Sequence, residues 1–427
     1  MVPRVYTRSI IETFHYIKFS GAWLHSVVTE HRSQSLPDLI SFFPFFFLTS
    51  HSLALQARRT ERMASTPAAL PLAETTSSLV EAVQSGAPAA AVEALLNAGA
   101  DARFQDEASG RTVLMLAAQQ GTVAVVQELL NAGAPWNALD RSGRCAGEYA
   151  LEAGHQPVID QLVEFGVRCE LLLSALGKQS PGEDGSESRD YLSSSLTFVG
   201  ALDEPGAKIV DARGEAVMMA WETPLMEVHA KALLAGDDGV ARNIVNVGFG
   251  LGIFDRFVEE LRAEGRVDQH VVVEAHPDVM KRIVAEGFDK LPNVTVIFGR
   301  WQDALLDGRL LAAVGGGANY DCIFFDTFAE HYSDMREFHS ALPSLMRANG
   351  RYSFFNGFCP DNVFFQGVYC RIVELEMAQL GFTSMFMSVE MTAPEAALLK
   401  SDATWAGIKR RYFYDRTYFM PMCVRTH

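Results

Sequence analysis

Apolar and polar residues alternate regularly in the C-terminal part of the chain, from residue 191 onward. Short apolar runs predict strands at residues 243–247, 270–273, 294–298, 320–325 and 351–355. Amphipathic stretches predict helices at residues 253–263, 277–286, 334–347 and 362–380. Strands and helices that alternate in this way predict a mostly parallel sheet with helices on both faces. Such a sheet binds its ligands at the carboxyl ends of the strands.

Upstream of this region, a six-residue pattern recurs with a period of 33 to 34 residues. Leu95–Ala100 reads Leu-Leu-Asn-Ala-Gly-Ala, returns as Leu129–Ala134 and recurs in degenerate form as Leu162–Val167. A period of this length indicates stacked repeats, and the middle copy resembles the ankyrin repeat in its turn, its two short helices and its closing glycine. We expect an α-helical ankyrin stack over residues 71–170. Its concave face is a candidate surface for a protein partner, with a purely structural appendage as the alternative.

Two segments follow neither pattern. Residues 177–190 contain no apolar residue, which predicts a flexible linker and makes residues 191–427 a separate domain. The longest apolar run of residues 1–62 is interrupted by two prolines and an aspartate, and it is shorter than the roughly 18 residues that span a bilayer. We interpret residues 1–62 as an unstructured or spuriously translated N-terminal extension, with an organelle transit peptide as the alternative, and expect no membrane partner.

Composition limits the classes of function. The chain has 427 residues, and 48% of them are hydrophobic, which suits two or three globular domains. A formal net charge of −16 disfavours nucleic acid and suits a basic protein or a cationic ligand. The six cysteines form no Cys-x-x-Cys pair, so we expect no metal site and a reducing compartment, the cytoplasm and the nucleus.

A glycine-rich turn follows the first predicted strand of the C-terminal domain. Residues 248–253 read Gly-Phe-Gly-Leu-Gly-Ile, and such glycines let the backbone approach a ligand closely. The dinucleotide fingerprint needs a glycine where Ile253 stands, which disfavours hydride chemistry. The next strand ends at Glu274, placed to accept hydrogen bonds from two ribose hydroxyls. Turn and acid together predict a nucleoside site of the S-adenosylmethionine type, with a helix-capping role for Glu274 as the alternative.

Four separated motifs resemble guanidinoacetate N-methyltransferase: residues 217–226, 247–250, 299–303 and 325–328. With ankyrin repeats in front, the chain resembles the protein arginine N-methyltransferase 2 family, which methylates the internal δ-nitrogen (N5) of arginine. The resemblance implies a class I S-adenosylmethionine-dependent methyltransferase fold, Rossmann-like, with S-adenosyl-L-methionine as methyl donor. It also implies that the donor pocket is lined by Tyr191, Met218, Met226, Gly248, Phe249, Gly250, Leu251, Gly252, Ile253, Glu274, Ala275, His276, Trp301, Gln302 and Asp326.

Residue chemistry points to two catalytic carboxylates, Glu222 and Asp326. Both reactants of such a transfer are cations. The donor is a sulfonium, and a guanidinium has a pKa above about 12 and therefore stays protonated. Carboxylates accept pairs of guanidinium N–H bonds, orient one nitrogen toward the methyl group and take up the released proton. The structural alternatives are a loop cap for Asp326 and a helix N-terminal acid for Glu222.

The remaining motifs bear on the substrate. Residues 356–358 read Asn-Gly-Phe and offer no hydroxyl to a small substrate's carboxylate, which favours an arginine within a protein over free guanidinoacetate. The chain lacks the double-acid and Thr-His-Trp loops of the enzymes that methylate terminal nitrogens. His229 is expected in the core, His331 and Tyr332 are weak substrate candidates, and residues 410–412 and 418–421 are expected in sheet. A small-molecule guanidine methyltransferase and an ankyrin scaffold with a vestigial methyltransferase fold stay open as alternatives.

Overall fold

The structure is a computed structural model that describes residues 72–426 apart from 177–185, 202–203, 205, 237–238, 318 and 415. The predicted N-terminal extension, residues 1–62, therefore lies outside the described residues. The chain divides into two compact units, with the boundary between Gly166 and Val167. Each unit is described by itself.

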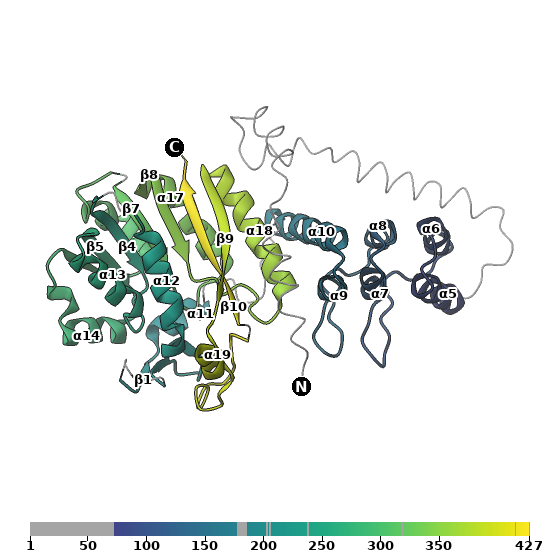
Figure 1. Ribbon diagram of the computed structural model, residues 1–427, viewed down its shortest axis with the longest axis horizontal. Helices are drawn as coiled ribbons and strands as arrows, with labels where there is room; N and C mark the ends of the chain where they lie inside the picture. Colours follow the sequence, from purple (N-terminus) through teal and green to yellow (C-terminus); the bar gives the residue numbers. More distant parts are fainter. Residues whose placement is uncertain are drawn as a thin grey trace. The chain divides into compact units, whose positions relative to one another are not determined.

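The first unit is built from short helices that pair and stack, as Figure 1 shows in purple and blue. Its helices are α5 (Leu72–Gln84), α6 (Ala89–Asn97), α7 (Val113–Gln120), α8 (Val123–Asn131), α9 (Ala146–Ala153) and the start of α10 (Gln156–Ala175). Helix α7 begins where the Thr112 hydroxyl accepts a hydrogen bond from the Met115 amide, and it ends at Gly121 in the left-handed conformation. Leu114 and Leu129 are fully buried between helices. The predicted ankyrin stack is confirmed.

The second unit contains a seven-stranded sheet with the order β6-β5-β4-β7-β8-β10-β9. Its strands are β4 (Arg242–Val247), β5 (Val267–Glu274), β6 (Val294–Phe298), β7 (Tyr320–Phe325), β8 (Met346–Phe354), β9 (Phe382–Glu390) and β10 (Thr417–Arg425). The first five strands are parallel, and β10 runs antiparallel to both β8 and β9. The strand order reverses between β4 and β7, so a ligand site is expected beyond the carboxyl ends of these two strands.

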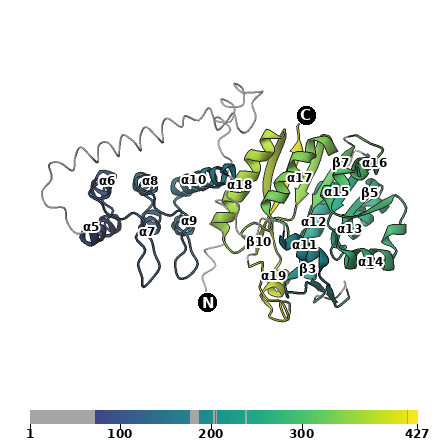
Figure 2. The same cartoon turned by 180° about the vertical axis from the view of Figure 1, so that it is seen from behind.

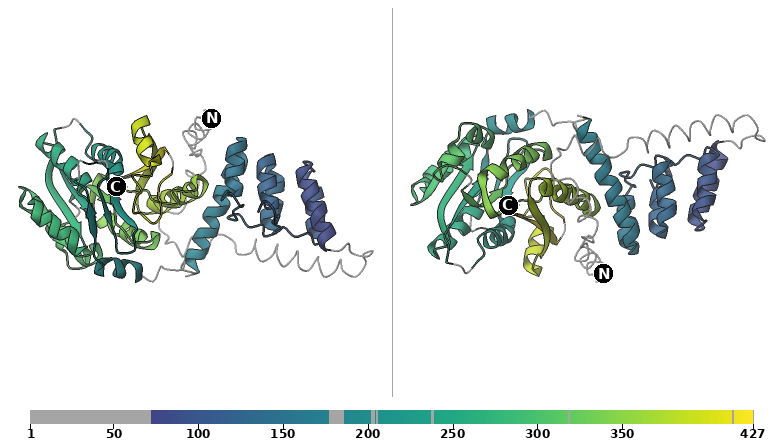
Figure 3. Two further views of the ribbon diagram at one scale, coloured as in Figure 1. Left: turned by 90° about the horizontal axis from the view of Figure 1, so that it is seen from below. Right: turned by 90° about the horizontal axis from the view of Figure 1, so that it is seen from above.

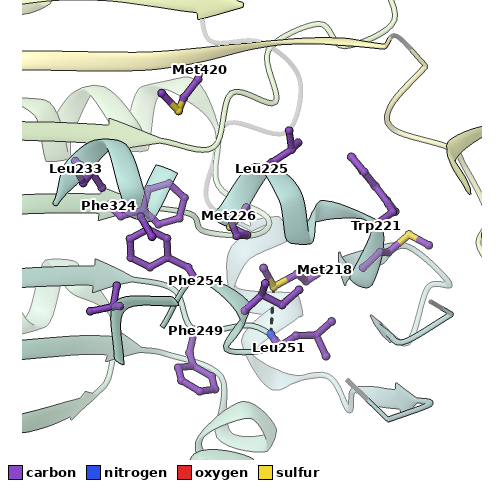
Figure 4. Packing of buried hydrophobic residues seen from close by; sticks show 14 of the residues in the cluster. Met218, Trp221, Leu225, Met226, Leu233, Phe249, Leu251, Phe254, Phe324 and Met420 are labelled. Carbon is purple, nitrogen blue, oxygen red and sulfur yellow. Dashed lines mark hydrogen bonds between the residues drawn. The ribbon is translucent and has the colours of Figure 1, made fainter. Parts of the chain in front are cut away.

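Helices cover both faces of this sheet, as Figures 2 and 3 show from further sides. They are α12 (Thr223–Leu233), α13 (Ile253–Ala263), α14 (Pro277–Glu286), α15 (Trp301–Leu306), α16 (Arg309–Ala312), α17 (Tyr332–Leu345) and α18 (Val363–Gln379). Phe324 and Phe325 are neighbours on β7 and enter opposite hydrophobic clusters, because successive strand side chains point to opposite faces. Phe324 stacks on Phe254 of α13 at 4.1 Å (Figure 4), while Phe325 packs on Phe338 of α17 at 4.6 Å.

A small antiparallel sheet precedes the large one and leads into the site. It consists of β1 (Thr197–Val199), β2 (Lys208–Val210) and β3 (Ala216–Met219), and a short 3-10 helix, η1 (Ala220–Glu222), connects it to α12. Two further helices, α11 (Ser186–Ser193) and α19 (Ala393–Lys400), complete the unit. The mostly parallel sheet with helices on both faces, expected from the pattern, is confirmed, and it agrees with the class I methyltransferase fold that the resemblance implies.

Three local expectations need correction. The predicted linker 177–190 ends in helix, since residues 186–190 belong to α11, which is anchored by Tyr191 packing on His276 at 4.8 Å. Residues 346–347, predicted as helix, begin β8, because α17 ends at Leu345 and Met346 pairs with Tyr320 of β7. Residues 410–412, predicted as sheet, form an irregular segment before β10.

Candidate active site

Glycines after β4 let the carboxyl ends of β4 and β7 come together. Gly248 has a φ of +98°, and a Cβ at this position would lie 1.9 Å from the Asp326 carbonyl oxygen. The Asp326 amide in turn donates to the Val247 carbonyl at 2.9 Å. Gly252, with φ +73°, caps α13 at its N-terminus, and the Phe249 ring leaves no room for a Cβ at this position. Only glycine fits the Gly248 position, so the turn is shaped by the approach of β7.

A pocket open to solvent lies beyond these strand ends, and its empty space, including the solvent at its mouth, is about 680 Å³. Small molecules bind at this place in a doubly wound sheet. Of the residues predicted for the donor pocket, those that line it are Tyr191, Met218, Gly248, Gly250, Glu274, Ala275, Trp301 and Asp326. The strand-order reversal and the pocket therefore coincide.

The other predicted residues do not line this pocket. They are Met226, Phe249, Leu251, Gly252, Ile253, His276, Gln302 and Glu222. Met226 of α12 is fully buried in the core. The Phe249 ring of the glycine-rich turn faces inward as well and packs on Phe288 at 5.1 Å. Leu251 is buried too, and its amide donates to the Met218 sulfur at 3.2 Å, the dashed line in Figure 4.

Glu274 holds the glycine-rich turn at the end of β5. Its Oε2 accepts a hydrogen bond from the Phe249 amide at 3.0 Å, and its Oε1 accepts one from the His276 amide at 2.6 Å. Burial raises the pKa of this carboxyl, and the backbone donors oppose that rise. Four backbone amides oppose the rise, those of Phe249, Gly250, Ala275 and His276. A carboxylate has about four lone-pair sites, so a ligand hydroxyl has to share a site with one of these amides or replace it.

An aromatic group closes one side of the pocket. The Tyr191 ring of α11 meets Phe328 edge-on at 4.9 Å and lies 4.8 Å from the His276 ring. The His276 ring nitrogen Nε2 is hydrogen-bonded to the Tyr191 carbonyl at 3.1 Å, and burial lowers the pKa of this histidine. His276 therefore supports Tyr191 from behind and does not reach the pocket.

A third carboxylate, which the sequence pattern does not single out, stands in the pocket wall. Glu330 accepts hydrogen bonds from Trp301 Nε1 at 3.0 Å, from Thr327 Oγ1 at 2.7 Å and from Gln302 Nε2 at 3.4 Å. Burial raises its pKa. The Gln302 Oε1 atom is buried without a partner among the described residues. The sequence does hold a signal for Glu330, because this residue follows Asp326 by four positions in the same loop.

Glu222 and Asp326 are coupled electrostatically. Burial, followed by the charge of Asp326, raises the pKa of Glu222 to about 8, although hydrogen bonds from Tyr412 and the Met219 amide oppose the rise. Burial and then the charge of Asp255 raise the pKa of Asp326 to about 7. Asp326 lines the pocket, and its carboxylate accepts no hydrogen bond from any described residue. Two interacting carboxyls with raised pKa values, one of them in a pocket wall, make this place a candidate functional site.

The histidine candidates lie elsewhere. His229 is fully buried between Ser353 Oγ at 2.8 Å and Tyr418 OH at 2.9 Å. Burial lowers its pKa to about 3, so it is a neutral core residue, as expected. His331 begins α17, and the Tyr332 hydroxyl donates to Glu376 at 2.5 Å, so neither joins the pocket lining.

Among the described residues, no group of three or more His, Cys, Asp or Glu is arranged to hold a metal ion. Within the same part of the chain, no helix has the length and apolar character needed to cross a membrane.

The doubly wound sheet with its one reversed strand, β10, and the glycine-rich turn with its pocket at the switch point, define a class I methyltransferase. Comparisons with known proteins agree. Residues 79–171 match the model "Ankyrin repeats (3 copies)", and residues 196–355 match "Guanidinoacetate N-methyltransferase". The protein arginine N-methyltransferase 2 of Cryptococcus neoformans is 36% identical over 81% of this chain and 93% of its own length.

Further relatives carry the same name. The Aspergillus oryzae protein is 34% identical over 70% of this chain and 77% of its own length. The Saccharomyces cerevisiae protein is 29% identical, again over 70% of this chain and 77% of its own length. The chain belongs to the protein arginine N-methyltransferase 2 family and is a methyltransferase with ankyrin repeats.

Proposed function

We propose that the protein transfers a methyl group from S-adenosyl-L-methionine to the δ-nitrogen of an arginine residue in a protein substrate. The observation that carries this proposal is the pair of carboxyls Glu222, whose pKa is raised by burial and by the Asp326 charge, and Asp326, whose pKa is raised by burial, because a cationic donor and a guanidinium would stabilise the ionised form of both. The names of the relatives support arginine as the substrate.

The residues of the pocket fit the donor. Peptide groups at Gly248 and Gly250 are free of side chains, as close approach of the donor's methionine part requires. Glu274 lines the pocket at the end of β5, where its carboxylate oxygens can accept from ribose hydroxyls in competition with the backbone amides. When bound, the donor supplies an electrophilic methyl group on a sulfonium that departs as a neutral thioether.

The two carboxylates supply the rest of the chemistry. Glu222 and Asp326 accept guanidinium N–H bonds, and this contact turns the δ-nitrogen toward the methyl group and holds it at attack distance. A new N–C bond forms while the S–C bond breaks, and the nitrogen loses one proton. Bound cations favour the ionised form of Glu222 over the raised pKa of about 8, and the ionised carboxylate then takes up this proton.

Two features favour an arginine within a protein. Asn356, which follows β8, is fully buried, and its side-chain amide donates to the Phe419 carbonyl at 2.8 Å, so it offers nothing to a substrate carboxylate. The net charge of −16 suits a basic substrate protein, and the ankyrin stack suits its recruitment. The compartment that we propose for this activity is the cytoplasm and the nucleus.

The full chain should be incubated with S-adenosyl-L-methionine labelled in its methyl group and with a cell extract. Protein and small molecules are then separated, and labelled arginine species are identified after hydrolysis. Label recovered as δ-N-methylarginine in protein is the expected result. Label only in small guanidino compounds would establish the alternative suggested by the guanidinoacetate methyltransferase match of residues 196–355. No label together with no donor binding would favour an ankyrin scaffold.

A further inference from the structure

The segment between α19 and β10 is fastened against the small sheet. The buried Lys208 ammonium of β2 donates to the Thr404 carbonyl at 3.1 Å and to the Ala406 carbonyl at 2.6 Å. The Lys409 amide donates to the Gly214 carbonyl at 2.8 Å in the turn between β2 and β3. These contacts hold the segment in one conformation, although it lacks regular secondary structure after α19.

This segment carries Tyr412, whose hydroxyl donates to Glu222 Oε1 across 190 residues of sequence. The ring of Tyr412 packs against Trp221 at 5.6 Å and against Trp405 at 5.3 Å. The Trp405 Nε1 atom donates to the Leu399 carbonyl at 2.7 Å, which fixes that indole. The tyrosine hydroxyl is therefore aimed at Glu222 by a set of packed rings.

The hydrogen bonds to Glu222 fall on one of its two oxygens. Oε1 accepts from Tyr412 and also from the Met219 amide at 2.9 Å, while Oε2 accepts no hydrogen bond from any described residue. The carboxylate is 3% exposed, so its orientation is set by these two donors. Oε2 therefore keeps unused acceptor capacity, although Glu222 itself does not line the pocket.

We propose that Tyr412 is a positioning residue for methyl transfer, which fixes the Glu222 carboxylate with Oε2 free for the guanidinium and favours its ionised form. The inference rests on the proposed function, because it takes Glu222 as the carboxylate that contacts the guanidine. Burial and the Asp326 charge raise the pKa of Glu222, and the Tyr412 hydrogen bond opposes them. Without that bond, Glu222 keeps its proton to a higher pH and turns more freely.

The test compares Tyr412→Phe with Tyr414→Phe in the full chain. Tyr414 is 56% exposed in the same segment, and its hydroxyl donates only to the Arg411 carbonyl among the described residues, so it is a matched control. We expect Y412F to lower kcat/KM about 10- to 100-fold, the usual effect of losing a hydrogen bond to a charged group. The midpoint of the rise of kcat/KM with pH should move to higher pH, donor affinity should stay unchanged, and Y414F should resemble wild type.

A merely structural role would lower kcat/KM equally at every pH. A Y412F profile with an unmoved midpoint, or a further loss when Y412F is added to Glu222→Gln, would overturn the proposal. If Y412F does not fold, fluorotyrosine at position 412 keeps the ring and the hydroxyl but is a stronger donor. The midpoint should then move to lower pH, and an unmoved midpoint overturns the proposal.

The same assays separate this inference from the proposed function. The assay uses as substrate whichever guanidine the wild-type protein methylates. If that substrate is a small molecule, the proposed function is contradicted, but Y412F and Y414F can still be compared. An active wild type with Y412F indistinguishable from Y414F would overturn the inference alone. A wild type that transfers no methyl group to any guanidine would overturn both.

Discussion

Glu222 is a buried carboxyl whose ionised form is disfavoured by its surroundings in the protein. Burial and the neighbouring Asp326 carboxylate both raise its pKa, which reaches about 8. A bound sulfonium or guanidinium reverses this balance, because an opposite charge nearby favours the ionised acid. Binding of the cations and ionisation of the carboxylates are thus linked, and the linkage is measurable in both stability and affinity.

We predict that Glu222→Gln changes the pH dependence of stability. The folded-state pKa is raised above the unfolded value of about 4.3, so the free energy of unfolding falls as pH rises from about 4 to 8. The variant lacks this titration and should gain stability relative to wild type over that window. Chemical denaturation at pH 5 and at pH 8 measures the difference. A difference that does not change with pH would contradict the raised pKa.

We predict that Gly248→Ala abolishes donor binding and lowers the thermal unfolding midpoint. The new Cβ would lie 1.9 Å from a backbone oxygen of Asp326, which cannot move without displacing β7. Gly265→Ala is the control, because Gly265 also has positive φ but nothing lies within 4 Å of its Cβ position. The control should cost only about 1–2 kcal/mol of left-handed strain. Equal donor affinity in the two variants would contradict the close approach.

Regular elements could be predicted where their pattern is local, whereas contacts between distant segments could not. The helices 253–263 and 277–286 have the predicted bounds, because each begins after a turn and has a continuous apolar face. The start of β8 was missed, because residues 347–349 are exposed and offer no apolar run, and because its pairing with β7 shifts register. Tyr412 carries no local signal, since its partner Glu222 lies on a distant element. The glycine-rich turn was predictable because its glycines lie close together in sequence, at every second position from 248 to 252.

A buried ionic contact joins β5 to α13. The His270 ring lies between Asp255 Oδ1 at 3.1 Å and Glu259 Oε1 at 2.9 Å, and Asn246 donates to both oxygens of Asp255. Although burial alone would lower the pKa of His270, the two carboxylates raise it overall. The contact therefore stabilises the helix that follows the glycine-rich turn while His270 is protonated.

We predict that His270→Phe costs about 3–5 kcal/mol of stability at pH 6, because two carboxylates lose their buried partner. His339→Phe is the control: His339 is equally buried, its pKa is lowered to about 3, and its ring contacts Tyr352 OH at 3.1 Å. Its cost should be about 1–3 kcal/mol. The His270 effect should shrink as pH rises through the raised pKa. If His270→Phe costs the same at pH 6 as at a pH above the raised pKa of His270, the contact has no ionic role.

At the scale of the whole molecule, net charge and the ankyrin stack bear on substrate choice. The chain carries 52 acidic and 36 basic residues, and we propose that long-range attraction recruits a basic substrate protein. We predict that kcat/KM for a basic protein substrate falls as ionic strength rises from about 0.05 to 0.3 M, because salt screens exposed charges. Steady-state assays at fixed pH measure this dependence. A rate independent of salt would contradict electrostatic recruitment.

The most direct test of the account is the identity and amount of methylarginine formed by wild type, Asp326→Asn and Asp268→Asn. Asp268 is exposed near the start of β5, at the end of the sheet opposite the pocket, and is a neutral control. We predict δ-N-methylarginine in protein for wild type and D268N, and at least about 100-fold less for D326N, the usual effect of losing a group that stabilises charge in the transition state. Equal turnover by D326N would remove this carboxylate from the mechanism, and methyl groups on the terminal nitrogens would contradict the proposed δ-nitrogen.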